Sequence, residues 1–114
     1  MTDPECVFCK IIHEDPMPRA ALRVSDDAVI IPDIRPSAPV HYLVIPKRHI
    51  ASIQEIGHDD EALIGHMIHL AKEAAVMLGL TGYKLVFNVG RDGGQIVPHI
   101  HLHLLGGWKE GETK

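Results

Sequence analysis

The segment GQIVPHIHLHLLGGW, residues 94–108, places three histidines at alternate positions. His99, His101 and His103 alternate with aliphatic residues, and alternation is the period of a β-strand, whose successive side chains point to opposite faces. We therefore predict a strand that buries its aliphatic face and presents three imidazoles on the other. Same-face neighbours lie about 6.5–7 Å apart along a strand, which suits one phosphate group or one metal ion held by two rings. A polar strand face without chemistry is the alternative that the pattern leaves open.

Four further segments have strand character. Two short β-branched runs at residues 20–27 and 27–33 are separated by a turn at Asp26-Asp27. The run VHYLVIP, residues 40–46, follows a proline-rich loop, and we expect it to pair antiparallel with the run before that loop. KLVFNV, residues 84–89, precedes the glycine-rich loop GRDGGQ. Together with the histidine segment, these runs predict about five strands in an antiparallel sheet.

Residues 59–79 form the long helix of the chain. Their apolar residues recur at helical spacing, at Leu63, Met67, Leu70, Ala74 and Leu78. Asp59 or Asp60 can cap the start of the helix, and Gly79 can end it in a left-handed conformation. Residues 7–13 predict a second, short helix. We predict an α+β fold with this sheet and these helices, in a single domain over residues 1–114.

The composition of the chain argues against nucleic acids and membranes as binding partners. The 114 residues carry a net charge of −4, and no run of Lys and Arg predicts a nucleic-acid surface. No segment approaches the length of a membrane span, and the N-terminus MTDPECVFCK has no apolar signal segment. We therefore predict a cytoplasmic protein that binds neither nucleic acid nor membrane. In that compartment two cysteines indicate a metal pair or free thiols rather than a disulfide.

The heptad HIHLHLL resembles the signature of the histidine triad (HIT) family of nucleotide hydrolases and transferases. CVFCKII, DIRPSAPVHYLVIPKRHI and GGQIVPHIHLHLLGG resemble other landmarks of that family in the same order, from Cys6 to Gly107. HLLGG is similar to the Hint branch, the purine nucleoside phosphoramidases, more than to the branch that splits dinucleoside polyphosphates. The resemblance implies a HIT-like α+β fold and a homodimer, joined partly through residues 59–79 and 84–89.

The resemblance also implies a mechanism. His101 is the nucleophile that attacks the α-phosphorus of a nucleoside phosphoramidate, such as adenosine 5′-monophosphoramidate or an aminoacyl adenylate, to form a nucleotidyl-histidine. Water then releases AMP or GMP. His103 steadies the phosphate charge or assists the leaving group, and His99 completes the catalytic triad. His41 is expected close behind the site. An unprotonated imidazole nitrogen is a good nucleophile near pH 7, which fits this chemistry.

The same resemblance implies substrate-binding positions. Asp33 accepts hydrogen bonds from the ribose hydroxyls, because a carboxylate can accept two donors. The other expected substrate-binding residues are Ile31, Ile34, Asn88, Gly94, Gln95 and Ile96. On pattern alone, Asp33 and Asn88 are equally typical of turns. Ile96 and Ile31 depart from the family pattern, where a hydroxyl residue and a phenylalanine are common. Ile96 cannot donate a hydrogen bond to a leaving group.

Cys6 and Cys9 form a CxxC pair, which supplies half of a tetrahedral zinc site. Members of the family with this pair bind zinc through two further histidines, which are His49 and His99 here. The resemblance thus implies one structural Zn²⁺; two buried thiols in a short helix are the alternative. Three functions remain open at this stage: a phosphoramidate or dinucleoside polyphosphate hydrolase, a metal-binding protein, and a nucleotide-binding module with weak catalysis.

Overall fold

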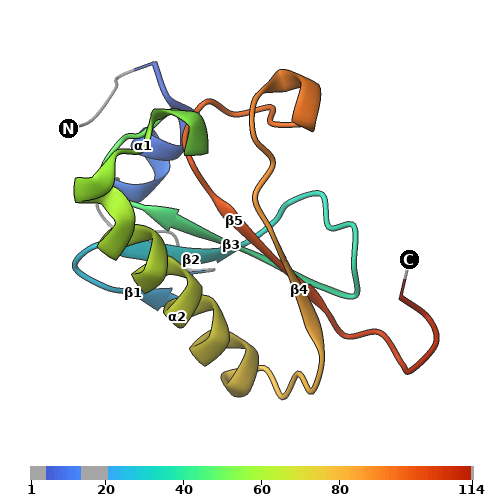
Figure 1. Cartoon of the computed structure of the whole chain (residues 1–114). Coiled ribbons are helices and arrows are strands. Elements are labelled where there is room, and N and C mark those ends of the chain that lie inside the picture. The colour runs from blue at the N-terminus through green and yellow to red at the C-terminus, as the bar shows by residue number, and fades with distance from the viewer. Residues whose placement is uncertain (1–4, 14–20, 114) are drawn as a thin grey trace.

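A computed structural model describes residues 5–13 and 21–113. It contains the predicted α+β architecture, one five-stranded antiparallel sheet with one long and one short helix (Figure 1). The helices are α1 (Val7–Ile12) and α2 (Glu61–Met77), and short 3₁₀ turns lie at Ile53–Glu55, His58–Asp60 and Arg91–Gly93. The strands are β1 (Arg23–Val24), β2 (Ala28–Pro32), β3 (Val40–Pro46), β4 (Tyr83–Val86) and β5 (Leu102–Gly106).

The sheet has the order β1-β2-β3-β5-β4, and all neighbours are antiparallel. β2 and β3 pair across the proline-rich loop, as predicted, with Ile31 opposite Leu43. β5 lies between β3 and β4, so His103, the one histidine of the segment within β5, lies on an interior strand of the sheet. In that register Leu43 is opposite His103 and Val44 is opposite Leu102. Alternation therefore assigns His103 to the face that carries Ile31 and Leu43.

α2 covers the other face of the sheet (Figure 1). The predicted apolar stripe of this helix is confirmed, because Met67, Leu70 and Ala74 are at most 2 % exposed. They pack in one cluster with sheet residues of alternate positions, Ala28, Ile30, Val44, Leu102 and Leu104. Gly79 ends the helix with φ +72°, as predicted. The start differs: Asp60 makes no side-chain cap for α2 but accepts the Gly57 amide across the preceding 3₁₀ turn.

α1 packs against the histidine side of the sheet. Phe8, Cys9 and Ile12 are buried against Val29, Ile31, Leu43 and Ile45, which form a second cluster. Cys6 is the N-cap of the helix, and its sulfur accepts the Cys9 amide at 3.4 Å. α2 and α1 thus cover opposite faces of the sheet, and α1 lies on the face that carries His103.

β5 begins later than the sequence predicts. His99, Ile100 and His101 precede the strand. Ile100 is buried, as the alternation predicts, but His99 and His101 are buried too. The local reason for the later start is that their backbone is bonded elsewhere: the Ile100 amide donates to the Ile50 carbonyl at 2.7 Å, and the His99 carbonyl accepts from a side chain. Pro98 has no amide hydrogen to add to a ladder. Residues 99–101 therefore make hydrogen bonds to Ile50 and to a histidine side chain in place of the hydrogen bonds of a sheet ladder.

Among the helices of the described residues, none has the length and apolar character needed to cross a bilayer.

Candidate active site and metal centre

His99 is completely buried, and its ring is protonated at Nε2. Its Nε2 lies 2.8 Å from the carbonyl oxygen of Pro46. A carbonyl only accepts, so Nε2 carries the hydrogen and the neutral ring leaves a lone pair on Nδ1. Burial lowers the pKa of His99 to about 4, and the bond to Pro46 opposes that effect only in part. At neutral pH His99 therefore presents an unprotonated Nδ1.

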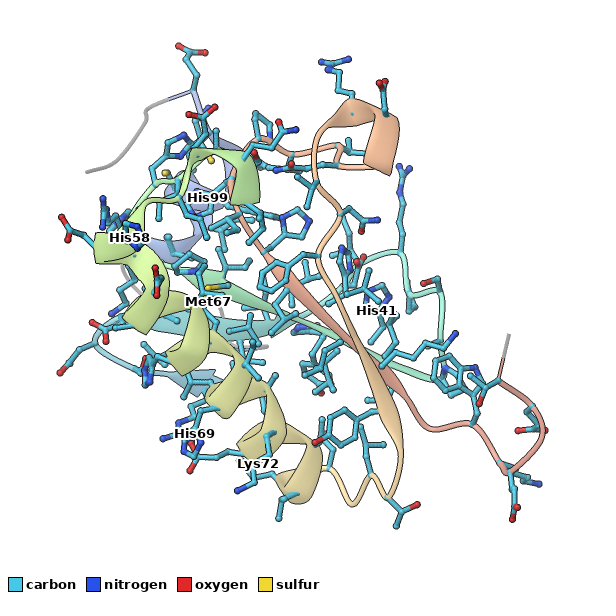
Figure 2. The ribbon with its side chains drawn as sticks, in the orientation of Figure 1. His41, His58, Met67, His69, Lys72 and His99 are labelled. Carbon is cyan, nitrogen blue, oxygen red and sulfur yellow. The ribbon has the colours of Figure 1, made fainter. Side chains whose placement is uncertain are left out.

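That lone pair points at the two cysteines and at His49. Nδ1 of His99 lies 3.3 Å from Sγ of Cys6, 3.5 Å from Sγ of Cys9 and 3.2 Å from Nδ1 of His49. Sγ of Cys9 is 3.3 Å from Nδ1 of His49. Figure 2 shows His99 beneath the yellow sulfur atoms near α1. The four residues predicted as metal ligands thus bring one ligand atom each to within 4.8 Å of all the others.

These distances fit a tetrahedral zinc site. With zinc–sulfur bonds of about 2.3 Å and zinc–nitrogen bonds of about 2.0 Å, the edges of such a tetrahedron are about 3.3–3.8 Å long. The observed separations of 3.2–3.5 Å are close to these edges. Nδ1 of His99 carries no hydrogen, so the 3.2 Å contact between it and Nδ1 of His49 contains at most one hydrogen, that of His49. Converging sulfur and nitrogen lone pairs are the donor set that Zn²⁺ prefers.

His101 holds its proton on the opposite nitrogen. Its Nδ1 lies 2.7 Å from the carbonyl oxygen of His99, which can only accept. The neutral ring therefore leaves Nε2 unprotonated. Burial lowers the pKa of His101, and both the hydrogen bond to His99 and the nearby carboxylate of Asp33 oppose that shift. His101 is 8 % exposed and lines a cavity, so a lone pair is available to a ligand there.

His103 lies next to His101, with ring centroids 4.9 Å apart. Its Nδ1 is 2.9 Å from Nε2 of His41, which is also 3.3 Å from Oδ2 of Asp33. Burial, together with the neighbouring His101 and His41, lowers the pKa of His103 to about 4. His41 comes from β3 and is labelled in Figure 2, some distance along the sheet from His99. His41 therefore contacts the third histidine of the triad from the neighbouring strand.

The cavity in front of the imidazoles has a volume of about 440 Å³. It is lined by His101, His103 and most of the predicted substrate-binding residues, which are Ile31, Asp33, Ile34, Asn88, Gly94 and Ile96. Ile34 and Ile96 are 93 % and 88 % exposed, so two aliphatic side chains are left uncovered beside the cavity. Gly94 has φ +90°, and a Cβ there would meet the Asn88 amide at 3.4 Å.

Gln95 supports the cavity from behind. Its side chain is buried and makes three hydrogen bonds, accepting from the Gly90 amide and donating to the carbonyls of Ala51 and Val97. These bonds close the glycine-rich loop, while Asn88 donates to the Gly93 carbonyl at 2.9 Å. The side chain of Gln95 therefore holds the loop in place, and only its backbone remains for the predicted approach to a phosphate.

Sequence reasoning missed one wall of the cavity. Val7, Phe8 and Ile11 of α1 line it, and the ring of Phe8 packs edge-on against His101 with centroids 5.1 Å apart. The same ring lies 5.9 Å from His99. The composition of VFCKII was a usable signal, because a short helix with four aliphatic or aromatic residues among six must pack against something. The helix that carries the cysteines thus also forms part of the cavity.

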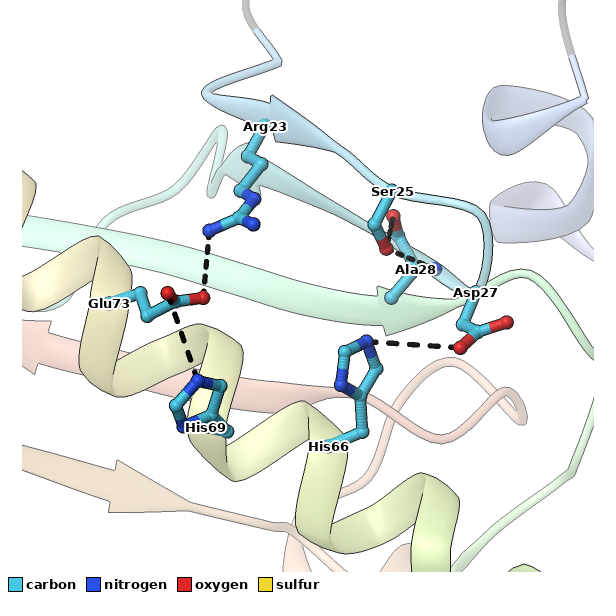
Figure 3. A network of polar contacts seen from close by, with 7 residues as sticks. All are labelled: Arg23, Ser25, Asp27, Ala28, His66, His69 and Glu73. Atoms are coloured by element: carbon cyan, nitrogen blue, oxygen red, sulfur yellow. Dashed lines mark hydrogen bonds and ion pairs between the residues drawn. The ribbon is translucent and has the colours of Figure 1, made fainter.

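The histidines of α2 belong to a separate polar network on the far side of the sheet. His69 and Arg23 share the carboxylate of Glu73, and His66 lies 3.8 Å from Asp27 (Figure 3). His69 and Arg23 are 58 % and 39 % exposed at the side chain. These are solvated ion pairs of the kind that contribute little to stability. They provide a natural control for the buried histidines.

Comparisons with known proteins give a family model and relatives for this chain. The family model described as "Scavenger mRNA decapping enzyme C-term binding" matches residues 5–113. An uncharacterized HIT-like protein of Synechococcus elongatus is 43 % identical over 104 residues, which are 90 % of each chain. The chain belongs to the histidine triad family. Its HIHLHLL heptad, read first as a strand pattern, is therefore the family signature.

Solved HIT structures share the fold. A HIT family hydrolase from Legionella pneumophila is 45 % identical, with a TM-score of 0.86 over 94 % of this chain and 96 % of that one. A histidine triad protein from Clostridium difficile is 33 % identical, with a TM-score of 0.90 over the whole of both chains. A zinc-bound histidine triad family protein from Mycobacterium smegmatis is 29 % identical, with a TM-score of 0.78 over 95 % and 78 %.

Proposed function

We propose that this HIT protein hydrolyses the P–N bond of purine nucleoside phosphoramidates through a nucleotidyl-histidine. The observation that carries the proposal is the 2.7 Å bond from His101 Nδ1 to the His99 carbonyl. It leaves Nε2 of a neutral, buried ring unprotonated beside a cavity. Nucleophilic catalysis needs such a nitrogen, and it splits one difficult displacement into two easier ones.

In the first step Nε2 of His101 attacks the α-phosphorus, the N–P bond forms and the P–N bond to the amine breaks. The departing amine takes its proton from water, because Ile96 has no hydrogen to donate. In the second step a water attacks the same phosphorus, a P–O bond forms and the bond between phosphorus and Nε2 of His101 breaks. The nucleoside monophosphate leaves, a proton passes to solvent, and His101 returns to its neutral form. The hydrogen stays on Nδ1 of His101 throughout, donated to the His99 carbonyl, and this bond stabilises the charge that develops on the ring.

The cavity supports a nucleotide as the ligand. A volume of about 440 Å³ lies within the usual range for small-molecule sites. Asp33 is available to a ribose: its Oδ1 accepts one amide, from Arg35, at 2.8 Å, and each carboxylate oxygen can accept more than one hydrogen bond. The aliphatic side chains of Ile31, Ile34 and Leu43 offer an apolar surface for a purine base. The Legionella relative is named a hydrolase, which is consistent with this activity.

We also infer that Cys6, Cys9, His49 and His99 hold one structural Zn²⁺. Four protein ligands fill the coordination shell, so the ion supplies a crosslink and no open position for catalysis. The crosslink ties α1, which forms one wall of the cavity, to the segment that carries His101. The zinc-bound relative from Mycobacterium smegmatis supports the choice of metal.

A homodimer joined through α2 and β4 is consistent with the surface. β4 is the last strand of the sheet in the described residues, and it leaves Tyr83 and Leu85 at least 36 % exposed. Val76 and Met77 at the end of α2 are at least 60 % exposed. An edge strand with apolar neighbours is a common site of pairing between chains. Light scattering at micromolar concentration tests this: we expect twice the mass of the chain, and a monomer contradicts it.

The test of the activity is to incubate the protein with adenosine 5′-monophosphoramidate. We expect release of AMP and, after a rapid acid quench, a protein mass increased by one adenylyl group. His101→Ala should form no adduct and lose at least about 10⁴-fold in kcat, because the nucleophile is gone, while nucleotide affinity changes by a few-fold. His66→Ala, on the far side of the sheet, is the matched control.

Two results would point elsewhere. An adduct that persists in His101→Ala removes the assignment of the nucleophile. Faster cleavage of a dinucleoside tetraphosphate than of the phosphoramidate would favour the alternative HIT activity. If neither substrate reacts and the protein binds only metal, the histidine segment serves as a ligand cluster alone.

A further inference from the structure

His41 lies 2.9 Å behind His103 and is bonded on both of its nitrogens. Its Nδ1 lies 3.0 Å from the backbone nitrogen of Ser37. A backbone amide always donates, so Nδ1 of His41 must accept and cannot carry a hydrogen. The proton of the neutral ring is therefore on Nε2. A doubly protonated His41 would set two donors against each other, so this contact keeps the ring neutral. Burial, which lowers the pKa of His41, acts in the same direction.

The hydrogen on Nε2 of His41 determines which ring nitrogen of His103 is protonated. Nε2–H of His41 faces Nδ1 of His103 at 2.9 Å and Oδ2 of Asp33 at 3.3 Å. A hydrogen on Nδ1 of His103 would collide with the hydrogen of His41, whichever of the two acceptors His41 prefers. Nδ1 of His103 therefore accepts, and the neutral ring of His103 carries its proton on Nε2.

We propose that His41 is a positioning residue: the amide of Ser37 sets its tautomer, and through it His103 is held with a proton on Nε2 as a neutral donor to the cavity. The chain Ser37–His41–His103 is a tautomer lock and not a proton relay. Its first member is a backbone amide, which can neither supply nor take up a proton. His103 therefore keeps its hydrogen and can only offer it as a hydrogen bond.

This lock gives His101 and His103 complementary tautomers. His101 presents a bare Nε2 to the cavity, and His103 presents an N–H beside it. If the proposed phosphoramidate chemistry holds, the N–H binds a phosphoryl oxygen while the lone pair of His101 attacks phosphorus. Preorganised donors aimed at an oxygen that gains charge are an effective means of stabilising a transition state. This assigns to His103 the first of its two expected roles, the stabilisation of phosphate charge.

The lock also predicts that His41, His103 and Asp33 hold no metal ion, although their ligand atoms lie within 4.8 Å of one another. Metal ligation by Nε2 of His41 would require that nitrogen to lose its hydrogen while Nδ1 still accepts from Ser37. The ring would then be an imidazolate. A hydrogen already occupies the space between the two rings, so the cluster is closed to a cation.

The test is nitrogen-15 NMR of protein labelled at histidine, at pH 7 and without nucleotide. Two-bond correlations distinguish a protonated from an unprotonated ring nitrogen. We expect His103 to be protonated at Nε2 in the wild-type protein and in His41→Gln, whose side-chain amide can donate to His103. In His41→Leu both nitrogens of His103 should show averaged shifts, because the two tautomers exchange freely. Asp33→Ala should leave His103 unchanged.

Three outcomes would overturn the lock. They are His103 protonated at Nδ1 or at both nitrogens in the wild type, an unchanged His103 in His41→Leu, and a tautomer of His103 that follows Asp33. His41→Gln and Asp33→Ala keep the test open if the leucine variant does not fold. With the phosphoramidate we expect His41→Leu to lower kcat about 100-fold at a similar KM, and His41→Gln to recover most of it. The spectra need no substrate, so they decide the lock even if the proposed activity fails.

Discussion

At one end of the histidine segment His99 faces Cys6, Cys9 and His49, and at the other His103 faces His41 and Asp33. Both clusters are compact groups of imidazoles with sulfur or oxygen, yet they differ in where hydrogens lie. At the His99 end the Pro46 carbonyl draws the proton to Nε2, and lone pairs converge on one point. At the His103 end the Ser37 amide occupies Nδ1 of His41, so the hydrogen of His41 is on Nε2, between the rings of His41 and His103. The comparison therefore predicts a metal ion only at the His99 end, because a backbone group decides whether the ligand atoms converge as acceptors.

The largest expected effect concerns the metal. The wild-type protein should contain one zinc ion per chain, and Cys6→Ser combined with Cys9→Ser should contain less than about a tenth of that. Structural zinc in small domains contributes an apparent ~10–16 kcal/mol of binding at neutral pH. This chain has its own core, so we expect the double variant to remain folded with a less stable α1. Elemental analysis measures the content.

Asp33→Ala is the matched change at the other end and should keep its zinc. Zinc that remains in the double cysteine variant but is lost from Asp33→Ala would reverse the comparison, because the ion would then sit between His41 and His103.

Phe8 links the His99 end to the nucleophile. Phe8 is 8 % exposed, and its ring packs against both His99 and His101. Phe8→Ala should lower the free energy of unfolding by about 3 kcal/mol through lost burial and the cavity left behind, and Phe8→Leu by about 1 kcal/mol. Urea denaturation measures both. A loss below about 1 kcal/mol in Phe8→Ala would show that α1 does not pack on the imidazoles as described.

The sequence predicted which face of the sheet the side chains of the histidine segment take better than it predicted where the strand begins. Alternation in HIHLHLL assigned Leu102 and Leu104 to the core and the histidines to the opposite face. Leu102 and Leu104 pack in the α2 cluster, and the register of β5 puts His103 on the face of Leu43. The same alternation predicted a strand from His99 onward, which is wrong, because β5 begins at Leu102. Local periodicity reports which face a side chain takes. It does not report that Ile50 and a histidine ring bind the backbone that the ladder would use.

The candidate ligands and cavity residues could be named from the family pattern, but their proton states could not. The groups that fix them are the carbonyls of Pro46 and His99 and the amide of Ser37. Every residue has such backbone groups, so no letter in the sequence marks the ones that matter. Only the tertiary structure shows which carbonyl and which amide meet an imidazole.

The pH dependence of stability tests the His103 end. Burial lowers the pKa of His103 from 6.5 to about 4 in the folded protein, so below pH 6.5 the unfolded chain binds a proton that the folded protein does not. Stability should therefore be full above pH 6.5 and fall as the pH drops toward 4. Because the ring is only partly buried, we expect His103 to account for about 2 kcal/mol of that loss.

His103→Gln should remove this share of the slope. The comparison is made between the two proteins at matched zinc content, since acid also displaces zinc. Equal slopes in thermal denaturation between pH 7 and 4.5 would mean that His103 titrates alike in the folded and unfolded states.

The smallest effect is expected in the α2 network, where histidines are neither buried nor locked. The side chains of Arg23 and Glu73 are 39 % and 37 % exposed, although their bond is 2.8 Å long. Arg23→Ala or His69→Ala should change the free energy of unfolding by less than about 1 kcal/mol. Zinc content and AMP release should be unchanged in both. A loss of either would mean that this network communicates with the triad.

The central claim is that backbone groups, directly or through His41, fix which ring nitrogen carries the proton in each of the three neighbouring histidines, and so give the histidines different roles. One nitrogen-15 histidine spectrum of the wild-type, zinc-loaded protein at pH 7 tests it directly. We predict His99 protonated at Nε2 with a metal-shifted Nδ1, His101 protonated at Nδ1 with a bare Nε2, and His103 protonated at Nε2. If His101 and His103 show the same protonated nitrogen, or if any of the three is an imidazolium, the account is contradicted.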